Sequence, residues 1–229
     1  MKEETAGRVH EALSARGLAG KRDYVRSLEQ RQDEQGLTLL VECLSDESGY
    51  LRELAEAALA KIGERGGPPL LPLLRQGLWY ARSSAARALG GMAYAPGAGA
   101  LLELVEDRVD AVAREAAAAL AAIGAHGGAA RIAWELHRAP AERRAARLQR
   151  LRARDVTLAL RVERLLGAEH LMAHPDPDGL RDDAPLVRAW EERTWREDQK
   201  KGSAPVEAQP PRPVGTPDPA ASGADASAR

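Results

Sequence analysis

Arginine side chains recur at matching positions along this sequence, and they are its first candidates for chemistry. Arg52 and Arg82 stand at equivalent places in two alanine-rich segments, and Arg114 is displaced by one position in a third. A guanidinium binds carboxylates, carbonyl groups or phosphates in a fixed planar geometry. We favour a structural role, in which each arginine bonds an acid or a carbonyl of the adjoining turns, here Asp46, Asp107 or Asp110. The alternative is a row of side chains that binds an anion or a peptide.

The alternative row consists of residues that lie off the apolar stripe of these segments. They are the candidate partner-binding residues, namely Arg52, Glu56, Arg82, Arg87 and Arg114. The contribution of such charges to affinity depends on whether the partner desolvates them, since charges at the rim of an interface add little. Both interpretations of the arginines therefore stay open at this stage.

A second basic group lies in the stretch 143–154, which contains no acidic residue. Steps of four, three and four residues place four of its arginines on one helix face. These alternative anion-binding candidates are Arg143, Arg147, Arg150 and Arg154. Four like charges repel one another unless an anion or an acidic surface meets them, and a phosphate backbone is one such partner. We favour a solvated face, because no aromatic residue is interleaved and the chain has a formal net charge of −1.

The other reactive residue types form no recognisable catalytic group. His170 and His174 have the i, i+4 spacing of a metal pair but lack a firm third ligand. The acidic run from Asp176 to Asp183 lacks the spacing of a calcium loop, and its prolines favour a turn. Cys43 lies beside leucines on an apolar stripe, which predicts a core residue. We therefore predict no cofactor, no metal site and no enzymatic activity.

The elements that carry these residues repeat along the chain. Segment 59–63 returns as 89–93 and as 120–124, each time behind an alanine-rich helix. A shorter helix with an apolar i, i+4 pair precedes each copy and appears once more, the pairs being Leu40 and Leu44, Leu70 and Leu74, Leu101 and Val105, and Ile132 and Leu136. Both registers repeat every thirty to thirty-one residues. Such a period predicts helix pairs that bury their apolar faces by stacking on their neighbours.

The pattern V/L-R-x-x-A-x-x-A-L-x-x-I-G after a short helix resembles bacterial HEAT repeats, in particular the short subtype named after phycobilisome lyases. The resemblance covers residues 37–139 and is weaker over 140–152. It implies an all-α, right-handed α-solenoid of HEAT/armadillo-like helical-hairpin repeats. It specifies an architecture and no single activity, because such repeats occur in scaffolds, adaptors, lyase subunits and nucleic-acid enzymes.

Four regions follow from the pattern. We predict N-terminal capping helices in 1–35, HEAT-like repeats in 36–152, C-terminal capping helices in 153–201 and a disordered Pro/Ala-rich tail in 202–229. The caps hold expected helices at 2–16, 21–34, 156–172 and 186–200, with Gly17 and Gly20 separating the first two and Gly36 ending the second.

Aromatic residues make up 3% of the chain and phenylalanine is absent, so the core must consist of Ala, Leu, Ile and Val. We expect Trp79 and Trp134 to pack between repeats. Of Trp190 and Trp195, which do not share one helical stripe, one should dock on the helices and the other should be exposed.

The sequence thus predicts a non-catalytic scaffold or adaptor that binds a protein partner on the concave inner face of the solenoid. One alternative is a bilin-lyase-like enzyme or enzyme subunit. Another is binding of nucleic acid or an acidic partner through the basic stretch Arg143–Arg154. The charged start of the sequence is unlike a secretory signal, no run approaches the roughly 18 apolar residues of a membrane span, and the single cysteine permits no intrachain disulfide. We therefore expect a cytoplasmic protein with no membrane contact.

Overall fold

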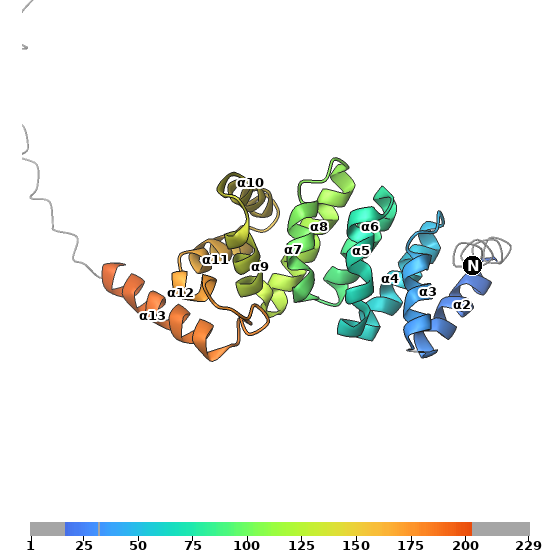
Figure 1. Cartoon of the computed structure of the whole chain (residues 1–229), viewed down its shortest axis with the longest axis horizontal. Helices are drawn as coiled ribbons and strands as arrows, with labels where there is room; N and C mark the ends of the chain where they lie inside the picture. The colour runs from blue at the N-terminus through green and yellow to red at the C-terminus, as the bar shows by residue number, and fades with distance from the viewer. Residues whose placement is uncertain (1–16, 32, 203–229) are drawn as a thin grey trace, which may run out of the picture. The chain divides into compact units, whose positions relative to one another are not determined.

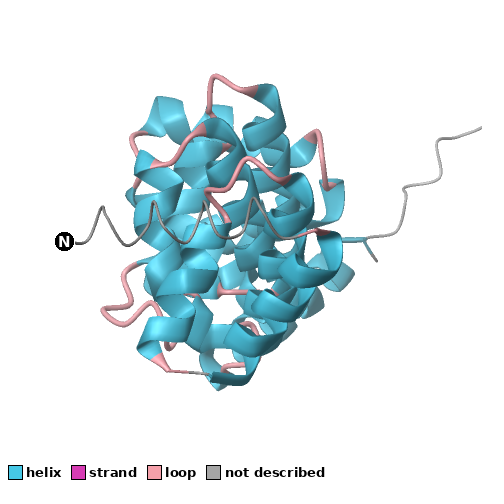
Figure 2. Cartoon of the chain, turned by 90° about the vertical axis from the view of Figure 1, so that its right-hand side faces the viewer, coloured by secondary structure: helices cyan, strands magenta, loops and turns pink. Residues whose placement is uncertain are grey.

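The computed structural model describes residues 17–31 and 33–202. Within these ranges every regular element is a helix (Figure 2). The helix expected at 2–16 and the tail after Gly202 lie outside the described residues. The chain divides into two compact units, Met1–Glu192 and Arg193–Arg229, and helix α13 (Pro185–Gly202) crosses that boundary. The helix packing described below belongs to the first unit.

Helices of the first unit follow one another in pairs along the sequence (Figure 1). The first members of the pairs are α3 (Glu34–Cys43), α5 (Leu71–Gln76), α7 (Ala98–Leu104) and α9 (Ala129–Arg138). The second members are α4 (Gly49–Ile62), α6 (Trp79–Gly91), α8 (Asp110–Ile123) and α10 (Ala141–Arg152). The helices before and after the pairs are α2 (Leu18–Arg31), α11 (Val156–Leu166) and α12 (Glu169–Met172).

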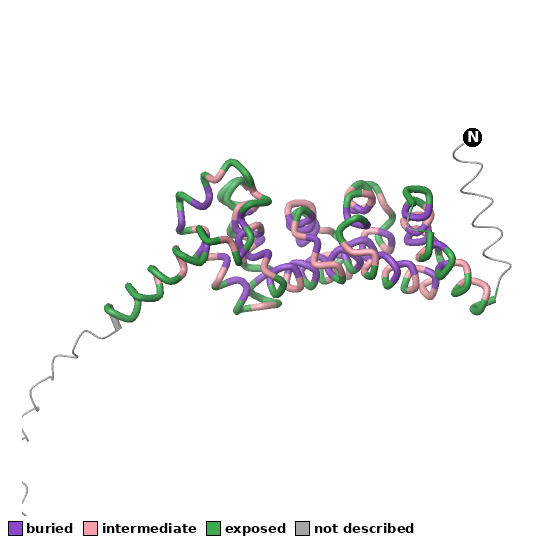
Figure 3. The backbone as a smooth tube through the Cα atoms, turned by 90° about the horizontal axis from the view of Figure 1, so that it is seen from below, coloured by how far each residue is buried: buried purple, intermediate pink, exposed green. Residues whose placement is uncertain are grey.

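Two layers of helices pack against each other. The second helices α4, α6 and α8 lie side by side, and α2 adjoins α4. Among the first helices, α5 packs on α7 and α7 on α9, while α3, α5 and α7 each pack on the second helix that follows. Figure 3 shows the buried residues gathered where these helices face one another. We call the solvent-exposed side of the α4, α6 and α8 layer the second-helix face.

Small side chains set the spacing within the second-helix layer. Ala85, Ala88, Ala116 and Ala119 are buried, as is Gly90 on α6. A Cβ atom placed on Gly90 would lie 2.8 Å from the Cα atom of Ala119 on α8. The close approach of α6 and α8 therefore requires glycine at this position, and the small buried side chains around it permit that approach.

Two helix boundaries differ from the sequence prediction. Gly20 lies inside α2, and Gly36 lies inside α3 instead of ending a helix. The reason for the second difference is Asp33, the N-cap of α3, whose carboxylate accepts a hydrogen bond of 2.6 Å from the Gly36 amide. An Asp at the N-cap satisfies an otherwise unpaired helix donor, so this cap decides where the helix begins. The hydrogen bond lowers the pKa of Asp33 below its usual value.

The segment predicted as one helix over 156–172 is two helices, α11 and α12, separated at Gly167 and Ala168. Asp155 caps α11 by accepting a hydrogen bond of 2.9 Å from the Leu158 amide. The buried stripe of α11 contains Leu158 and Val162, whereas Leu160 is exposed.

One stretch, Asp110–Arg138, is long and apolar enough to cross a membrane by length and composition alone, with a mean hydropathy of 1.2. It is weak evidence for a span, because 61% of its apolar window is buried inside the protein. The stretch is also interrupted between α8 and α9, where Gly127 adopts a φ of +90°. It consists of two core helices joined by a turn.

The tryptophans divide between buried and exposed positions. Trp134 packs partly buried on the core, as predicted, and its indole Nε1 donates a hydrogen bond of 3.2 Å to the His174 carbonyl. The prediction for Trp79 is wrong, since this residue is 51% exposed at the start of α6. Trp190 packs against the core whereas Trp195 is 60% exposed, which confirms the split predicted for that pair.

Candidate functional site

Arg82 on α6 binds two turns of the protein at once. Its Nε and Nη2 atoms each donate a hydrogen bond of 2.9 Å to the carboxylate of Asp107, in the turn after α7. Its Nη1 atom donates a further bond of 2.9 Å to the carbonyl of Gly77. Asp107 also accepts a hydrogen bond from the Val109 amide. This bidentate pair links one helix pair to the next.

Arg52 on α4 occupies the equivalent position in the preceding pair. Its Nη1 atom donates hydrogen bonds of 2.7 and 3.0 Å to the carbonyls of Asp46 and Glu47. Its guanidinium lies 4.9 Å from the centre of the Tyr80 ring. In the third pair Arg114 makes only an exposed ion pair of 3.5 Å with Asp110. These are the contacts that the structural interpretation of the arginines predicted.

A row of paired charges crosses the second-helix face. Arg87 of α6 donates hydrogen bonds of 2.9 and 2.7 Å to the carboxylate of Glu56 on α4. It also lies 3.9 Å from the carboxylate of Glu115 on α8. The hydrogen bond with Glu56 raises the pKa of Arg87. We call Glu56, Arg87 and Glu115 the charge row.

The surface beside the charge row is made of small residues. Ala57 on α4, Gly91 on α6 and Ala118 on α8 are exposed. Sequence reasoning missed Glu115, although it had selected Glu56 and Arg87. Glu56 and Arg87 are separated by one repeat period. Opposite charges at this separation indicate an ion pair between neighbouring second helices.

The basic stretch on α10 does not form one solvated face. Arg147 is buried, and its Nε atom donates a hydrogen bond of 2.9 Å to Glu106, in the turn after α7. Arg143, Arg150 and Arg154 are exposed. The expectation of four equivalent arginines is therefore wrong, because packing of α10 on the preceding helices turns one of them inward.

A hollow of about 720 Å³ lies between α5, α7, α9 and the start of α10. Four arginines and two glutamates are among its lining residues, namely Arg75, Arg138, Arg143, Arg147, Glu103 and Glu135. We call it the arginine groove. Arg75 and Arg138 were absent from the candidates drawn from the sequence, because neither occupies a repeated position and only the packing of the first helices brings them together.

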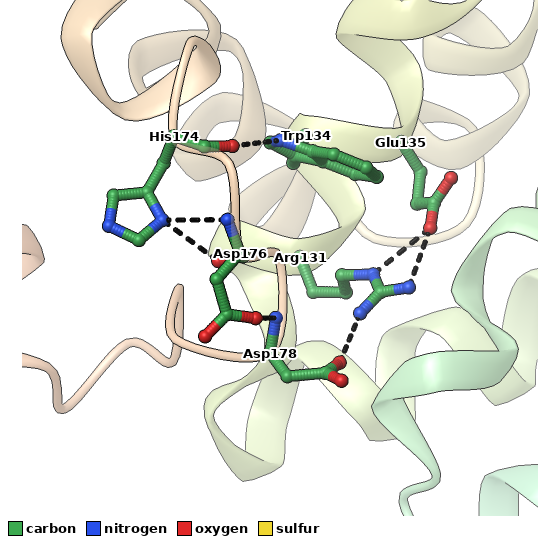
Figure 4. A network of polar contacts seen from close by, with 6 residues as sticks. All are labelled: Arg131, Trp134, Glu135, His174, Asp176 and Asp178. Carbon is green, nitrogen blue, oxygen red and sulfur yellow. Dashed lines mark hydrogen bonds and ion pairs between the residues drawn. The ribbon is translucent and has the colours of Figure 1, made fainter.

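A polar network anchors the turn after α12 to α9 (Figure 4). Arg131 donates hydrogen bonds to Asp178 and, at 3.0 Å, to Glu135. Asp176 caps the turn by accepting a hydrogen bond of 3.0 Å from the Asp178 amide. The Nδ1 atom of His174 lies 2.9 Å from the Asp176 carbonyl. The acidic run is thus a turn held by arginine, as its prolines indicated.

Asp182, a further residue of the acidic run, also bonds groups of the protein. Asp182 is buried, and its carboxylate accepts hydrogen bonds of 3.2 and 2.8 Å from the amides of Ala129 and Ala130 at the start of α9. It also pairs with Arg161 at 2.9 Å. Among the described residues, no group of three or more His, Cys, Asp or Glu side chains is placed to hold a metal ion.

Cys43 is a core residue, as predicted. Its side chain is 2% exposed on α3. Burial, with smaller contributions from the carboxylates of Asp46 and Glu42, raises the pKa of the thiol to about 12. The reactive thiolate is therefore strongly disfavoured near neutral pH.

Neither a protein-family model nor a curated protein matches this sequence. Among solved structures, the chain is similar to the crystal structure of an engineered protein from the Northeast Structural Genomics Consortium. The two are 18% identical, the similarity covers 86% of this chain and 97% of that one, and the TM-score is 0.36. A similarity of this size carries no argument about function.

Proposed function

We propose that this protein is a non-catalytic scaffold or adaptor built as a right-handed HEAT-like solenoid, and that the second-helix face binds a protein partner. The repeat period and the pairwise packing of α3 to α8 support the solenoid. The observation that carries the function is the charge row, which crosses three adjacent helices beside exposed small residues.

The side chains of this surface are held in place before a partner binds. Glu56 and Arg87 hold each other in place, so their side chains lose less conformational freedom when a partner covers them. Ala57, Gly91 and Ala118 project little from the helices, so the backbone of a partner helix can approach closely. Charges in a fixed pattern then select the register of the partner.

The test needs variants that leave the fold intact. Arg82→Glu is unsuitable, because it would place a second carboxylate against that of Asp107 and release the Gly77 carbonyl. Arg87→Gln with Arg114→Gln removes two exposed charges from α6 and α8 without setting a new carboxylate beside Glu56 or Glu115. The matched control is Arg150→Gln with Arg154→Gln, which removes two exposed charges at and just after the end of α10.

The experiment is a quantitative affinity capture from a lysate of the source organism, with circular dichroism to check helix content. We expect a protein partner whose recovery falls roughly tenfold with the Arg87 and Arg114 variant and is unchanged with the control. Loss of the partner with the control alone would contradict the proposal and favour the basic stretch on α10. Recovery of nucleic acid without protein, or lyase activity toward a bilin, would favour the corresponding alternative.

A further inference from the structure

The arginine groove lies on the first-helix side of the protein, away from the second-helix face. Its lining comes from α5, α7, α9, the short turn before α7 and the start of α10, all within the first unit. The volume of about 720 Å³ is within the range of ligand-binding clefts. The groove is therefore large enough to receive part of another molecule.

The charges of the groove are only partly balanced. Glu103 lies 3.6 Å from Arg75, and Arg147 is bonded to Glu106. Glu135 is held by Arg131, which is not among the lining residues. Both lining carboxylates are thus already paired with an arginine.

Two cations remain without a carboxylate. Arg143 is exposed, and none of the described carboxylates lies within ion-pair distance of it. Arg138 stacks on the indole of Trp134, with 4.6 Å from the guanidinium carbon to the ring centre, and it has no acidic partner among the described residues. Stacking leaves the edge N–H groups of a guanidinium free to donate. These two arginines are placed to bind carboxylates from outside.

The lining of the groove leaves room for a peptide backbone. Ala100 of α7 lines the groove with a minimal side chain, whereas the Glu135 carboxylate already lies over Gly99. The lining also includes Pro72, Pro96 and Pro140, which lack an N–H donor. A peptide backbone can approach small residues closely, while its acidic side chains reach the arginines.

The same features disfavour nucleic acid. The lining residues include no aromatic side chain on which a base could stack. Two unpaired arginines neutralise few phosphates of a continuous backbone. We infer that the arginine groove binds an extended acidic peptide segment of a partner protein, with Arg138 and Arg143 pairing with its carboxylates.

The test uses the full chain and a fluorescent peptide of alternating glutamate and alanine. Its matched probes are a lysine–alanine peptide and a single-stranded oligonucleotide. The groove variants are Arg138→Gln with Arg143→Gln, and the same pair changed to Glu. The matched control is Arg150→Glu with Arg154→Glu, which lies outside the groove lining.

We expect fluorescence anisotropy to detect the acidic peptide and not the lysine peptide. The Gln variant should weaken binding by roughly tenfold and the Glu variant should weaken it further, while the control changes it less than about twofold. Thermal unfolding of each variant shows that the fold is retained. No binding of the acidic peptide, an equal effect of the control, or tighter binding of the oligonucleotide would each overturn the inference. The charge-row variants test the proposed function separately, because they leave this groove unchanged.

Discussion

The contact between α6 and α8 makes a specific prediction about Gly90. In the variant Gly90→Ala, the added Cβ atom would lie 2.8 Å from the Cα atom of Ala119 and 3.0 Å from its Cβ atom. Neither atom can move without moving the helix. Because both atoms are fixed to the helix, overpacking here should fall in the upper part of its usual range, about 2–3 kcal/mol, and alanine returns about 1 kcal/mol in helix propensity. The net loss of stability should be about 1–2 kcal/mol, which lowers the melting temperature by about 2–8 °C.

Thermal unfolding followed by circular dichroism measures this change. The matched control is Gly49→Ala in the first turn of α4, where a Cβ atom would meet only the end of the Arg52 side chain, at 3.6 Å. We expect the control to keep or slightly raise the melting temperature. The second substitution Ala119→Gly should rescue Gly90→Ala only in part, since the contact with the Cα atom remains. Wild-type stability of Gly90→Ala would refute the close approach of these helices.

Three further predictions concern buried and capping residues. Ala88 is 1% exposed, so Ala88→Leu should lower the free energy of unfolding by about 1–3 kcal/mol in urea titrations. A neutral effect would mean that α6 buries a different face. The pKa of Asp33 is lowered in the folded protein, so its contribution to stability is complete above its usual pKa of 3.8 and disappears as the pH falls through the folded value. Asp33→Asn should remove this part of the acid unfolding profile, and an identical profile would contradict the cap. Cys43, with its raised pKa, should react with iodoacetamide only after denaturant unfolds the chain, and rapid alkylation of the native protein would show that the thiol is accessible.

The sequence was sufficient to predict the helical pairs and several of their contacts. Apolar spacing of three and four residues depends on the geometry of a single helix, so it identifies a helix without knowledge of its neighbours. A repeat period adds the order of packing, because equivalent helices meet equivalent neighbours. For this reason the contacts of Arg52 with Asp46 and of Arg82 with Asp107 could be anticipated.

Capping was the weaker part of the sequence prediction. Gly36 looked like the end of a helix because glycine is common there, but the Asp33 carboxylate makes it part of the first turn of α3. The capping residue Asp33 was also present in the sequence, and its hydrogen bond with the Gly36 amide decided that a helix begins here.

Tertiary structure alone decided the direction in which individual side chains point. Four arginines of the basic stretch share a spacing, yet Arg147 pairs with Glu106 while Arg143 stays exposed. Trp79 has a large aromatic side chain of the kind that usually packs in a core, but it lies on the surface. The arginine groove likewise combines residues from four helices that have no common period. Helical periodicity determines which residues share a face, whereas the crossing of one helix over another determines what that face meets, and that crossing depends on the packing of the whole layer.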